Sequence, residues 1–278
     1  MSSLKKKSKL EKQAADLISA SIGSNKQSDL DPSPGIFYPQ KYEFRASRLP
    51  FCPREMVIHH RYPDEALREE SYGFRFYVGI GTAVHEVIQQ FLGMNNVLYG
   101  HWSCCGVIEK ERLGSRSCPV CGRPQMYEEY NIEGSLGAHV DGIVPSMNAV
   151  WEFKTTGSSN LPKLTSPYKK HHVQASAYLE GINLQEGWDL DKIVFVYLSR
   201  DRPQDFKVFV VDPIPDTYTD AVESYSEARD SLYSGHIPDG ICKSSSEGSW
   251  SGCTYAGICF SPSLDSMLLP VSSLRKKI

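Results

Sequence analysis

The stretch Ala-His-Val-Asp-Gly-Ile-Val-Pro-Ser-Met-Asn-Ala-Val-Trp-Glu-Phe-Lys-Thr, residues 138–155, decides the fold and holds the first candidate site. Apolar or alternating residues over 131–145 and 149–154 predict two strands. The residues Pro-Ser-Met-Asn at 145–148 predict the turn that joins them. Two strands joined by so short a turn are expected to lie side by side, so charged residues on both would come close together.

Three charged residues interrupt this apolar stretch: Asp141, Glu152 and Lys154. Glu152 and Lys154 are two residues apart, so a strand directs both side chains to one face. Buried charges are costly unless they are paired or bind a metal ion. Asp141, at the end of the neighbouring strand, would complete a set of oxygen ligands of the kind that suits Mg²⁺ or Mn²⁺. The alternative is a structural ion pair between Glu152 and Lys154 on an edge strand.

A divalent cation at this position predicts phosphodiester hydrolysis, because the ion can bridge a phosphodiester oxygen and activate water. The cation would also lower the pKa of Lys154, so that its amine orients or deprotonates the attacking water. These two roles make Glu152 and Lys154 candidate catalytic residues.

The rest of the chain predicts helices that enclose a short mixed sheet, which is an α/β layout. Residues 82–92 place apolar side chains on one face of a helix. Near the N-terminus, Leu10, Ala14, Leu17 and Ile18 also have helical spacing. The remaining expected elements are helices over 53–93 (interrupted at Gly73, Gly79 and Gly81), 171–183 and 215–234, and strands over 193–199 and 206–211.

Two further motifs flank the charged stretch. Upstream, Gly-Thr-Ala-Val-His ends at His85. Downstream, His-Val-Gln-Ala-Ser-Ala-Tyr contains Gln174 and Tyr178, which are four residues apart and so share one helix face. Together with Asp141 and the Glu-x-Lys at 152–154, these motifs resemble the PD-(D/E)XK nuclease superfamily, and in particular its RecB-like branch. The resemblance covers about residues 50–260.

The resemblance implies a restriction-endonuclease-like core, a short mixed sheet flanked by helices. It also implies roles for particular residues. The Mg²⁺ or Mn²⁺ ligands would be His85, Asp141, Glu152 and the backbone carbonyl of Phe153. Lys154 would be the catalytic lysine, and Gln174 and Tyr178 would contact the DNA backbone or steady the site.

The activity implied is that of a metal-dependent DNA exonuclease, acting from DNA ends in recombination, repair or replication. Two alternatives stay open: a structure-specific DNA endonuclease, and a non-catalytic DNA-binding accessory module of the same fold. No Gly-x4-Gly-Lys-Ser/Thr motif is present in the sequence, so a helicase partner would be a separate chain, as would a recombination or replication protein.

Eight cysteines are the most informative feature of the composition. We expect no secretory leader, and hence a cytoplasmic protein of a bacterium or of a phage-infected host. In a reducing compartment disulfides do not persist, so this number of cysteines favours metal binding.

One cysteine group is split along the chain. Cys52, in Phe-Cys-Pro-Arg, precedes the nuclease motifs, whereas Cys242, Cys253 and Cys259 follow them. This layout resembles the CRISPR-associated RecB-like exonucleases and the AddB nuclease domain, and it implies a structural [4Fe–4S] cluster. The chain departs from the family between Cys242 and Cys253, where ten residues replace the usual two. Zinc and unliganded buried thiols are the alternatives.

The other group lies in a Cys/Gly-rich insert at 99–127, which resembles a zinc ribbon. Cys118-Pro-Val-Cys121-Gly is a tight knuckle that turns both sulfurs towards one metal ion. The first half is irregular, and offers either His101 with Cys104 or Cys104 with Cys105. Zinc in a closed structural site needs four ligands, so one structural Zn²⁺ is expected here. The insert would contact DNA or form a stable lobe.

Charge and composition complete the outline. The 278 residues carry 33 acidic and 30 basic side chains, a net charge of −3, with basic residues gathered at both ends. The composition excludes wholesale disorder, and the longest apolar runs are too short for a membrane span of about 20 residues. We expect a basic flexible tail at 1–35, a nuclease domain at 36–262 that is closed by the split cysteines, and a C-terminal tail at 263–278.

Overall fold

The structure is a computed structural model, and it describes residues 9–18, 20, 52–61, 72–132, 138–202, 204–234, 236–250, 253 and 255–261. Most of the expected tail at 1–35, and the whole of the expected tail at 263–278, lie outside these described residues. Within the described parts of the chain, no helix combines the length and the apolar character needed to cross a membrane.

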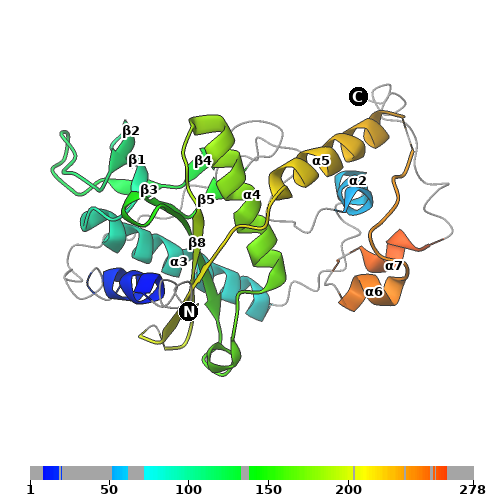
Figure 1. Cartoon of the computed structure of the whole chain (residues 1–278), viewed down its shortest axis with the longest axis horizontal. Helices are drawn as coiled ribbons and strands as arrows, with labels where there is room; N and C mark the ends of the chain where they lie inside the picture. Colours follow the sequence, from blue (N-terminus) through cyan, green and yellow to red (C-terminus); the bar gives the residue numbers. More distant parts are fainter. Residues whose placement is uncertain are drawn as a thin grey trace.

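A mixed sheet forms the centre of the fold (Figure 1), and the α/β class is confirmed. Its strands are Tyr99–Cys104 (β1), Val107–Leu113 (β2), Met126–Glu128 (β3), Gly142–Val144 (β6), Ala149–Thr156 (β7), Lys192–Ser199 (β8) and Phe206–Val211 (β9). They run in the spatial order β2-β1-β6-β7-β8-β9, and β3 pairs with β1. Only the β7–β8 pair is parallel among these pairs. Two short strands, Tyr130–Ile132 (β4) and Ala138–Val140 (β5), form a separate antiparallel pair.

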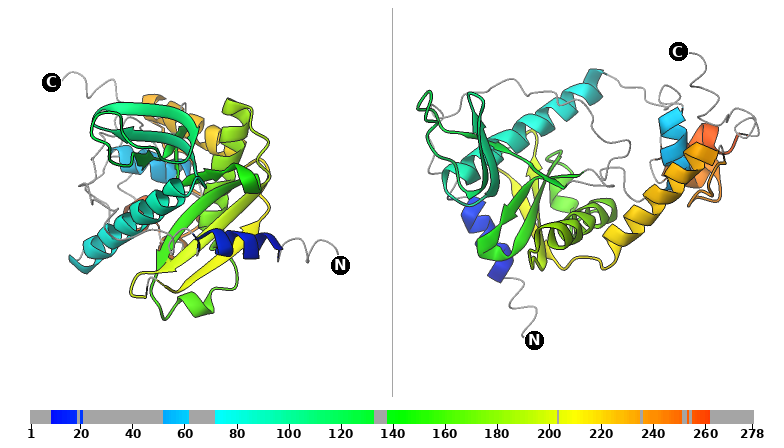
Figure 2. Two further views of the ribbon diagram at one scale, coloured as in Figure 1. Left: turned by 90° about the vertical axis from the view of Figure 1, so that its left-hand side faces the viewer. Right: turned by 90° about the horizontal axis from the view of Figure 1, so that it is seen from above.

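The described residues also form six α-helices, labelled α2 to α7. Their bounds are Pro53–Arg61 (α2), Tyr72–Met94 (α3), Lys169–Glu186 (α4), Thr217–Ser234 (α5), Ser245–Trp250 (α6) and Ala256–Cys259 (α7). A further helical segment covers residues 9–18. The 9–18 helix and α3 pack on one face of the sheet and α4 packs on the other (Figure 2). The expected N-terminal helix is therefore present, and its Ala14 and Ile18 are fully buried rather than part of a free tail.

β7 lies inside the sheet and is covered on both faces, which explains its nearly continuous apolar sequence. Trp151 and Phe153 belong to the core on the α3 side, whereas Val150 belongs to the core on the α4 side. Glu152 and Lys154 share the face of Val150, because side chains alternate along a strand. The alternation that buries Val150 therefore carries the Glu152 carboxylate into the interior.

α3 runs without a break through Gly79 and Gly81, where the sequence predicted interruptions. Close packing against the sheet accounts for two glycines of this helix, Gly81 and Gly93. A Cβ at Gly81 would lie 3.2 Å from the Thr155 hydroxyl, and a Cβ at Gly93 would overlap the ring of Trp102 at 2.0 Å. These glycines let the helix backbone approach the strands that carry the candidate site.

The insert at 99–127 is not a separate lobe. β1 pairs with β2 and β3 within the insert, and with β6 of the core at Tyr99 and Ile143. The insert therefore extends the central sheet at one edge. At the opposite end of the molecule, α2, α6 and α7 gather beside the far end of α5 (Figures 1 and 2).

Candidate functional site

Asp141 stands at the junction between β5 and β6, next to β7. The pairing of Gly142 with Trp151 places the aspartate beside the middle of β7. Its Oδ2 accepts a hydrogen bond of 2.7 Å from the backbone N–H of Phe153. The same Oδ2 lies 3.7 Å from Nδ1 of His85 on α3. The structure thus brings together His85 and Asp141, two of the four predicted cation ligands. It also places the backbone N–H of Phe153, another of the four residues, against Asp141.

Glu152 and Lys154 form an ion pair on β7, as their spacing predicted. Glu152 is 1% exposed, and its Oε1 accepts a hydrogen bond from the Lys154 ammonium. Its Oε2 is buried and accepts no hydrogen bond in the described part of the chain. A buried carboxylate oxygen without a donor is costly, so this atom marks a position where a cation would be favourable.

Glu129 was missed by the sequence reasoning. Its carboxylate, the His85 imidazole and the Asp141 carboxylate each offer a ligand atom, and these three atoms lie within 4.8 Å of one another. Gln89, one turn after His85 on α3, donates to the backbone carbonyl of Asp141 at 2.9 Å and to Glu129 Oε1 at 3.4 Å. Glu129 directly follows β3, so only the pairing of β3 with β1 and of β1 with the core places it here.

The carboxylates of this cluster hold their protons unusually tightly. Burial raises the pKa of Asp141 to about 7, with Lys154 opposing and Glu129 adding to the rise. Burial and the charge of Asp141 raise the pKa of Glu152 to about 7. Burial acts to lower the pKa of Lys154, but Glu152 and Asp141 outweigh it and the net direction is upward. Burial, followed by Lys154, lowers the pKa of His85, which favours the neutral, ligating imidazole.

A pocket of about 360 Å³ opens onto this cluster. Its lining residues are Gly81, Thr82, His85, Glu86, Gln89, Glu129, Lys154, Thr155 and His171. One wall, from α3 and the residue that follows β3, carries the candidate cation ligands His85 and Glu129. The other wall carries the Lys154 ammonium and the His171 imidazole of α4.

Gln174 and Tyr178 lie on the buried face of α4. Gln174 Nε2 donates to the Tyr178 hydroxyl at 2.6 Å, as the four-residue spacing predicted. Tyr178 is 3% exposed, so it is placed to steady the site from within. Burial raises its pKa, with Glu152 as the next cause, which shows that the hydroxyl lies near the carboxylates.

Four cysteines of the insert converge on one point. The Sγ atoms of Cys104, Cys105, Cys118 and Cys121 lie within 4.8 Å of one another. Cys104 pairs with Val107, so Cys105 and Gly106 form a two-residue hairpin turn with φ of 52° and 77°. Positive φ at both central residues defines the type I′ turn. This turn explains how two adjacent cysteines can replace the usual Cys-x2-Cys.

The second half of the insert is a knuckle, as predicted. The Gly122 N–H donates to the Cys118 carbonyl at 2.9 Å, and the Val120 N–H points at the Cys118 sulfur at 3.4 Å. The Arg123 backbone lowers the pKa of Cys121 to about 7. N–H groups aimed at sulfur favour the thiolate form that binds metal. The four-cysteine cluster is therefore consistent with a metal-binding insert.

His101 does not join this cluster. Its Nδ1 accepts a hydrogen bond of 3.2 Å from the backbone N–H of Glu111, and its ring contacts Tyr130 at 5.3 Å between centroids. Because alternate residues of β1 face opposite ways, His101 and Cys104 point to different faces. Of the two ligand sets left open by the sequence, the geometry matches Cys104 with Cys105.

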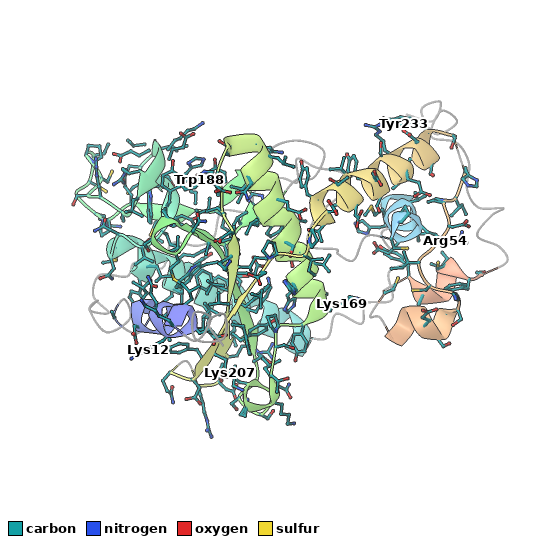
Figure 3. The ribbon with its side chains drawn as sticks, in the orientation of Figure 1. Lys12, Arg54, Lys169, Trp188, Lys207 and Tyr233 are labelled. Atoms are coloured by element: carbon teal, nitrogen blue, oxygen red, sulfur yellow. The ribbon has the colours of Figure 1, made fainter. Side chains whose placement is uncertain are left out.

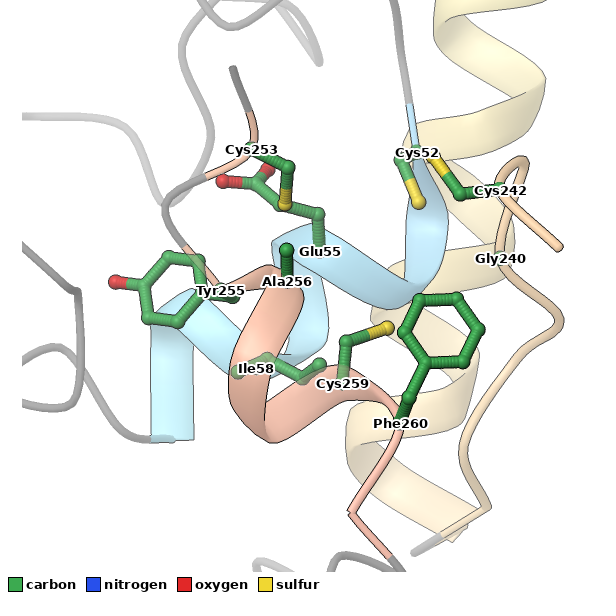
Figure 4. Close-up of a pocket in the computed structure, with 10 residues that line it drawn as sticks. All are labelled: Cys52, Glu55, Ile58, Gly240, Cys242, Cys253, Tyr255, Ala256, Cys259 and Phe260. Carbon is green, nitrogen blue, oxygen red and sulfur yellow. The ribbon is translucent and has the colours of Figure 1, made fainter. Parts of the chain in front are cut away.

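The four split cysteines line a second pocket (Figure 4). Cys52 immediately precedes α2, Cys242 precedes α6, Cys253 precedes α7, and Cys259 is the last residue of α7. All eight cysteines lie within the described residues and are free of disulfides. The structure thus gathers the expected set from segments some 190 to 207 positions apart, as the numbering shows.

Arg54 of the Cys-Pro-Arg motif, labelled in Figure 3, connects these segments directly. Its guanidinium donates to the carbonyls of Pro238 at 3.3 Å and Cys259 at 3.0 Å. Ile58 and Tyr255 bury a small core beside the thiols. Burial raises the pKa values of Cys253 and Cys259. This largely apolar pocket would hold neutral thiols unless a metal centre stabilised their thiolates.

Comparisons with known proteins leave the family open. No protein-family model matches the chain, and no curated protein matches it. A solved structure described as "Crystal structure of SSO0001" is similar, with 16% identity, a TM-score of 0.43, and coverage of 89% of this chain and 96% of that chain. A likeness at this level assigns neither a family nor an activity.

Proposed function

We propose that this chain is a divalent-cation-dependent DNA exonuclease of the RecB-like branch of the PD-(D/E)XK superfamily. The observation that carries the proposal is the convergence of His85, Asp141, Glu152 and Lys154, from three separate parts of the fold, beside a pocket that His85 and Lys154 line. A structural ion pair alone would need no second carboxylate and no histidine beside it. Buried acids with strongly shifted pKa values in a pocket are typical of functional sites.

The residues present fit a Mg²⁺ or Mn²⁺ ion. His85, Glu129 and Asp141 already cluster, and Glu152 contributes the buried oxygen that lacks a donor. Carboxylate oxygens with one imidazole suit Mg²⁺ or Mn²⁺. When bound, such a cation supplies charge stabilisation at a phosphodiester oxygen and makes water a better nucleophile.

The side chains of the chain itself perform the remaining tasks. The Phe153 N–H holds the orientation of Asp141, and Gln89 holds both Glu129 and the backbone at Asp141. Lys154 lies between Glu152 and the open pocket, where its ammonium can orient the attacking water. Tyr178, held by Gln174, fills the space behind the carboxylates and excludes water there.

Digestion of linear and covalently closed single-stranded DNA tests the proposal. With Mn²⁺, an exonuclease shortens the linear strand and leaves the closed circle intact. Cleavage of the circle would replace the proposal by a structure-specific endonuclease. Binding to both substrates without cleavage would replace it by a non-catalytic accessory module.

Glu129 provides the first prediction. Glu129→Gln removes one anionic oxygen from the cluster, so the affinity for Mn²⁺ should fall about 10- to 100-fold, as for other changes around metal ligands. Saturating Mn²⁺ should restore most of the turnover. Isothermal titration with Mn²⁺ measures this, with Glu128→Gln, the neighbouring acid outside the cluster, as the matched control. Equal affinities for wild type and Glu129→Gln would exclude Glu129 from the site.

The insert is proposed to bind one structural Zn²⁺ through its four cysteines. Cys118→Ser should lose the zinc, because a closed site needs all four ligands, while the cation requirement for hydrolysis stays the same. His101→Asn is the matched control and should keep a full equivalent of zinc. Metal analysis of gently purified protein decides the matter, and wild type without zinc would refute this assignment.

The split cysteines are proposed to hold a [4Fe–4S] cluster. The sulfur atoms of the insert cysteines lie within 4.8 Å of one another, close enough to bind one ion. Among the described residues, the four split cysteines form no such compact group. A cluster of four irons is larger than one ion, so its thiolates stand further apart. Four thiolates in a largely apolar pocket suit iron–sulfur ligation.

A further inference from the structure

His171 is placed in the pocket by α4, on the wall opposite the cation ligands. It belongs to none of the motifs quoted from the sequence. Its ring stacks on Tyr197 at 5.9 Å between centroids and an interplanar angle of 29°. Tyr197 is the strand partner of Lys154 across β7 and β8. The imidazole, the phenol and the ammonium therefore stand side by side.

The hydrogen bonds around Tyr197 define the tautomer of His171. The Tyr197 oxygen accepts the backbone N–H of Tyr168 at 3.1 Å, and it lies 2.8 Å from Nδ1 of His171. Tyr197 is 1% exposed, and burial raises its pKa to about 12, so the hydroxyl keeps its proton. His171 Nδ1 is the acceptor within reach of that proton. Nε2 then carries the hydrogen of the imidazole.

The charge state of His171 supports the same assignment. Burial, together with Lys154 and then Lys170, lowers the pKa of His171 to about 3. The ring is therefore neutral near pH 7 and has one N–H to donate. Nε2 stands on the edge of the ring away from Tyr197, and forms no hydrogen bond with the described residues. Lys169 and Lys170 are exposed just before His171 on the same helix, and Lys169 is labelled in Figure 3. Two cationic side chains there favour an anion nearby.

We propose that His171 binds a non-bridging phosphate oxygen of the DNA through Nε2–H, and that Tyr197 is the positioning residue that holds its ring. The inference rests on the proposed function and names the contact for the substrate phosphate. A neutral donor fits this wall because the cation and Lys154 already supply the positive charge. The Nε2–H donor also fixes the orientation of the phosphate, since a hydrogen bond weakens steeply when it is misaligned.

Two substitutions separate the ring nitrogens. His171→Asn keeps a polar atom near the Nδ1 position and loses the distal donor, whereas His171→Gln keeps an amide N–H near the Nε2 position. Loss of one hydrogen bond to a charged oxygen should lower kcat/KM about 10- to 100-fold in His171→Asn. His171→Gln should recover most of that loss. His172→Asn, whose partner is the Asp212 carbonyl outside the pocket, is the matched control.

Binding is measured separately from turnover. Fluorescence anisotropy of a labelled linear oligonucleotide with Ca²⁺ gives Kd, and digestion with Mn²⁺ gives kcat and KM. Tyr197→Phe should act through His171, so the double variant with His171→Asn should be no worse than His171→Asn alone. Melting temperatures identify variants that fail to fold.

The outcomes distinguish the two levels of the proposal. Wild-type hydrolysis with unchanged Kd and kcat/KM in His171→Asn overturns the role of His171 and leaves the nuclease intact. Equal losses in His171→Asn and His171→Gln, each matched by a lower melting temperature, show a structural role only and also overturn it. A wild type that binds DNA but does not cut it contradicts the proposed function, while the anisotropy series still decides the phosphate contact. A wild type that neither binds nor cuts overturns both.

Discussion

Glu152→Gln and Lys154→Ala should each lower the rate of DNA hydrolysis by at least about 10³-fold, as expected for groups that act on the cation and the attacking water. Glu152 is the proposed ligand whose buried Oε2 accepts no hydrogen bond from the described residues, and Lys154 is the ammonium that reaches the pocket. Because these contacts strengthen at the transition state, the loss should appear in kcat, with DNA affinity nearly unchanged.

The control for this prediction is Lys192→Ala. Lys192 forms exposed ion pairs with Asp191 and Asp212 at the start of the adjacent strand, away from the pocket. Surface pairs contribute about 1 kcal/mol or less, so this variant should keep wild-type activity and stability. Full activity in a Glu152→Gln, Lys154→Ala double variant would refute the site.

The same variants distinguish a functional cluster from a structural ion pair. If Glu152 and Lys154 form a stabilising structural ion pair, removing one partner should lower the folding stability by about 3–5 kcal/mol. In the metal-free protein, however, burial and Asp141 raise the pKa of Glu152 to about 7, so ionised Glu152 destabilises the fold. When folding raises the pKa of an acid, the folded protein loses stability as the pH rises from the unfolded-state pKa through the folded-state pKa. Glu152→Gln should therefore raise the melting temperature of metal-free protein, more at pH 8 than at pH 5.

Cys259→Ala should remove the proposed [4Fe–4S] cluster and most of the soluble yield. Ligation through Cys52 and Cys259 closes almost the whole described chain into one loop. On the loop-entropy scale used for disulfides, a closure of this length is worth about 5 kcal/mol. Protein purified without oxygen should be brown and contain acid-labile sulfide, and Cys259→Ala should lose the colour, the iron and the sulfide.

The two cysteine groups serve as controls for each other. Cys118→Ser should lose zinc and keep the brown colour, and Cys259→Ala should keep zinc in whatever fraction stays soluble. The hydrogen bonds from Arg54 to the carbonyls of Pro238 and Cys259 do not involve the thiols, so a soluble fraction is expected. A colourless wild type, prepared without oxygen and fully active, would favour free thiols or zinc in this pocket.

The sequence predicted the local parts of the site and missed those that depend on long-range pairing. Glu152 and Lys154 follow from the two-residue period of one strand, and Gln174 with Tyr178 from one helix turn. Glu129 could not be found in this way. It stands 44 positions after His85, and the pairing of β3 with β1 and of β1 with β6 brings it to the site. The only local signal was an acidic residue at the end of the insert.

The insert shows a second limit of sequence reasoning. Its knuckle at Cys118 and Cys121 was recognisable from spacing, but the choice between His101 and Cys105 depended on a hairpin turn. Cys105 with φ of 52° is unusual for a residue that carries a side chain, and only the register of β1 with β2 reveals it. His171 was likewise invisible, because its role depends on the buried hydroxyl of Tyr197 on a different strand.

The central claim is that one cation site between α3, β6 and β7 performs the chemistry. Anomalous diffraction from crystals soaked in Mn²⁺ tests it most directly. The account predicts a strong Mn²⁺ peak within coordination distance of His85, Asp141 and Glu152, and its loss in Glu152→Gln crystals. No peak at saturating Mn²⁺, or peaks only at exposed surface acids, would contradict the account.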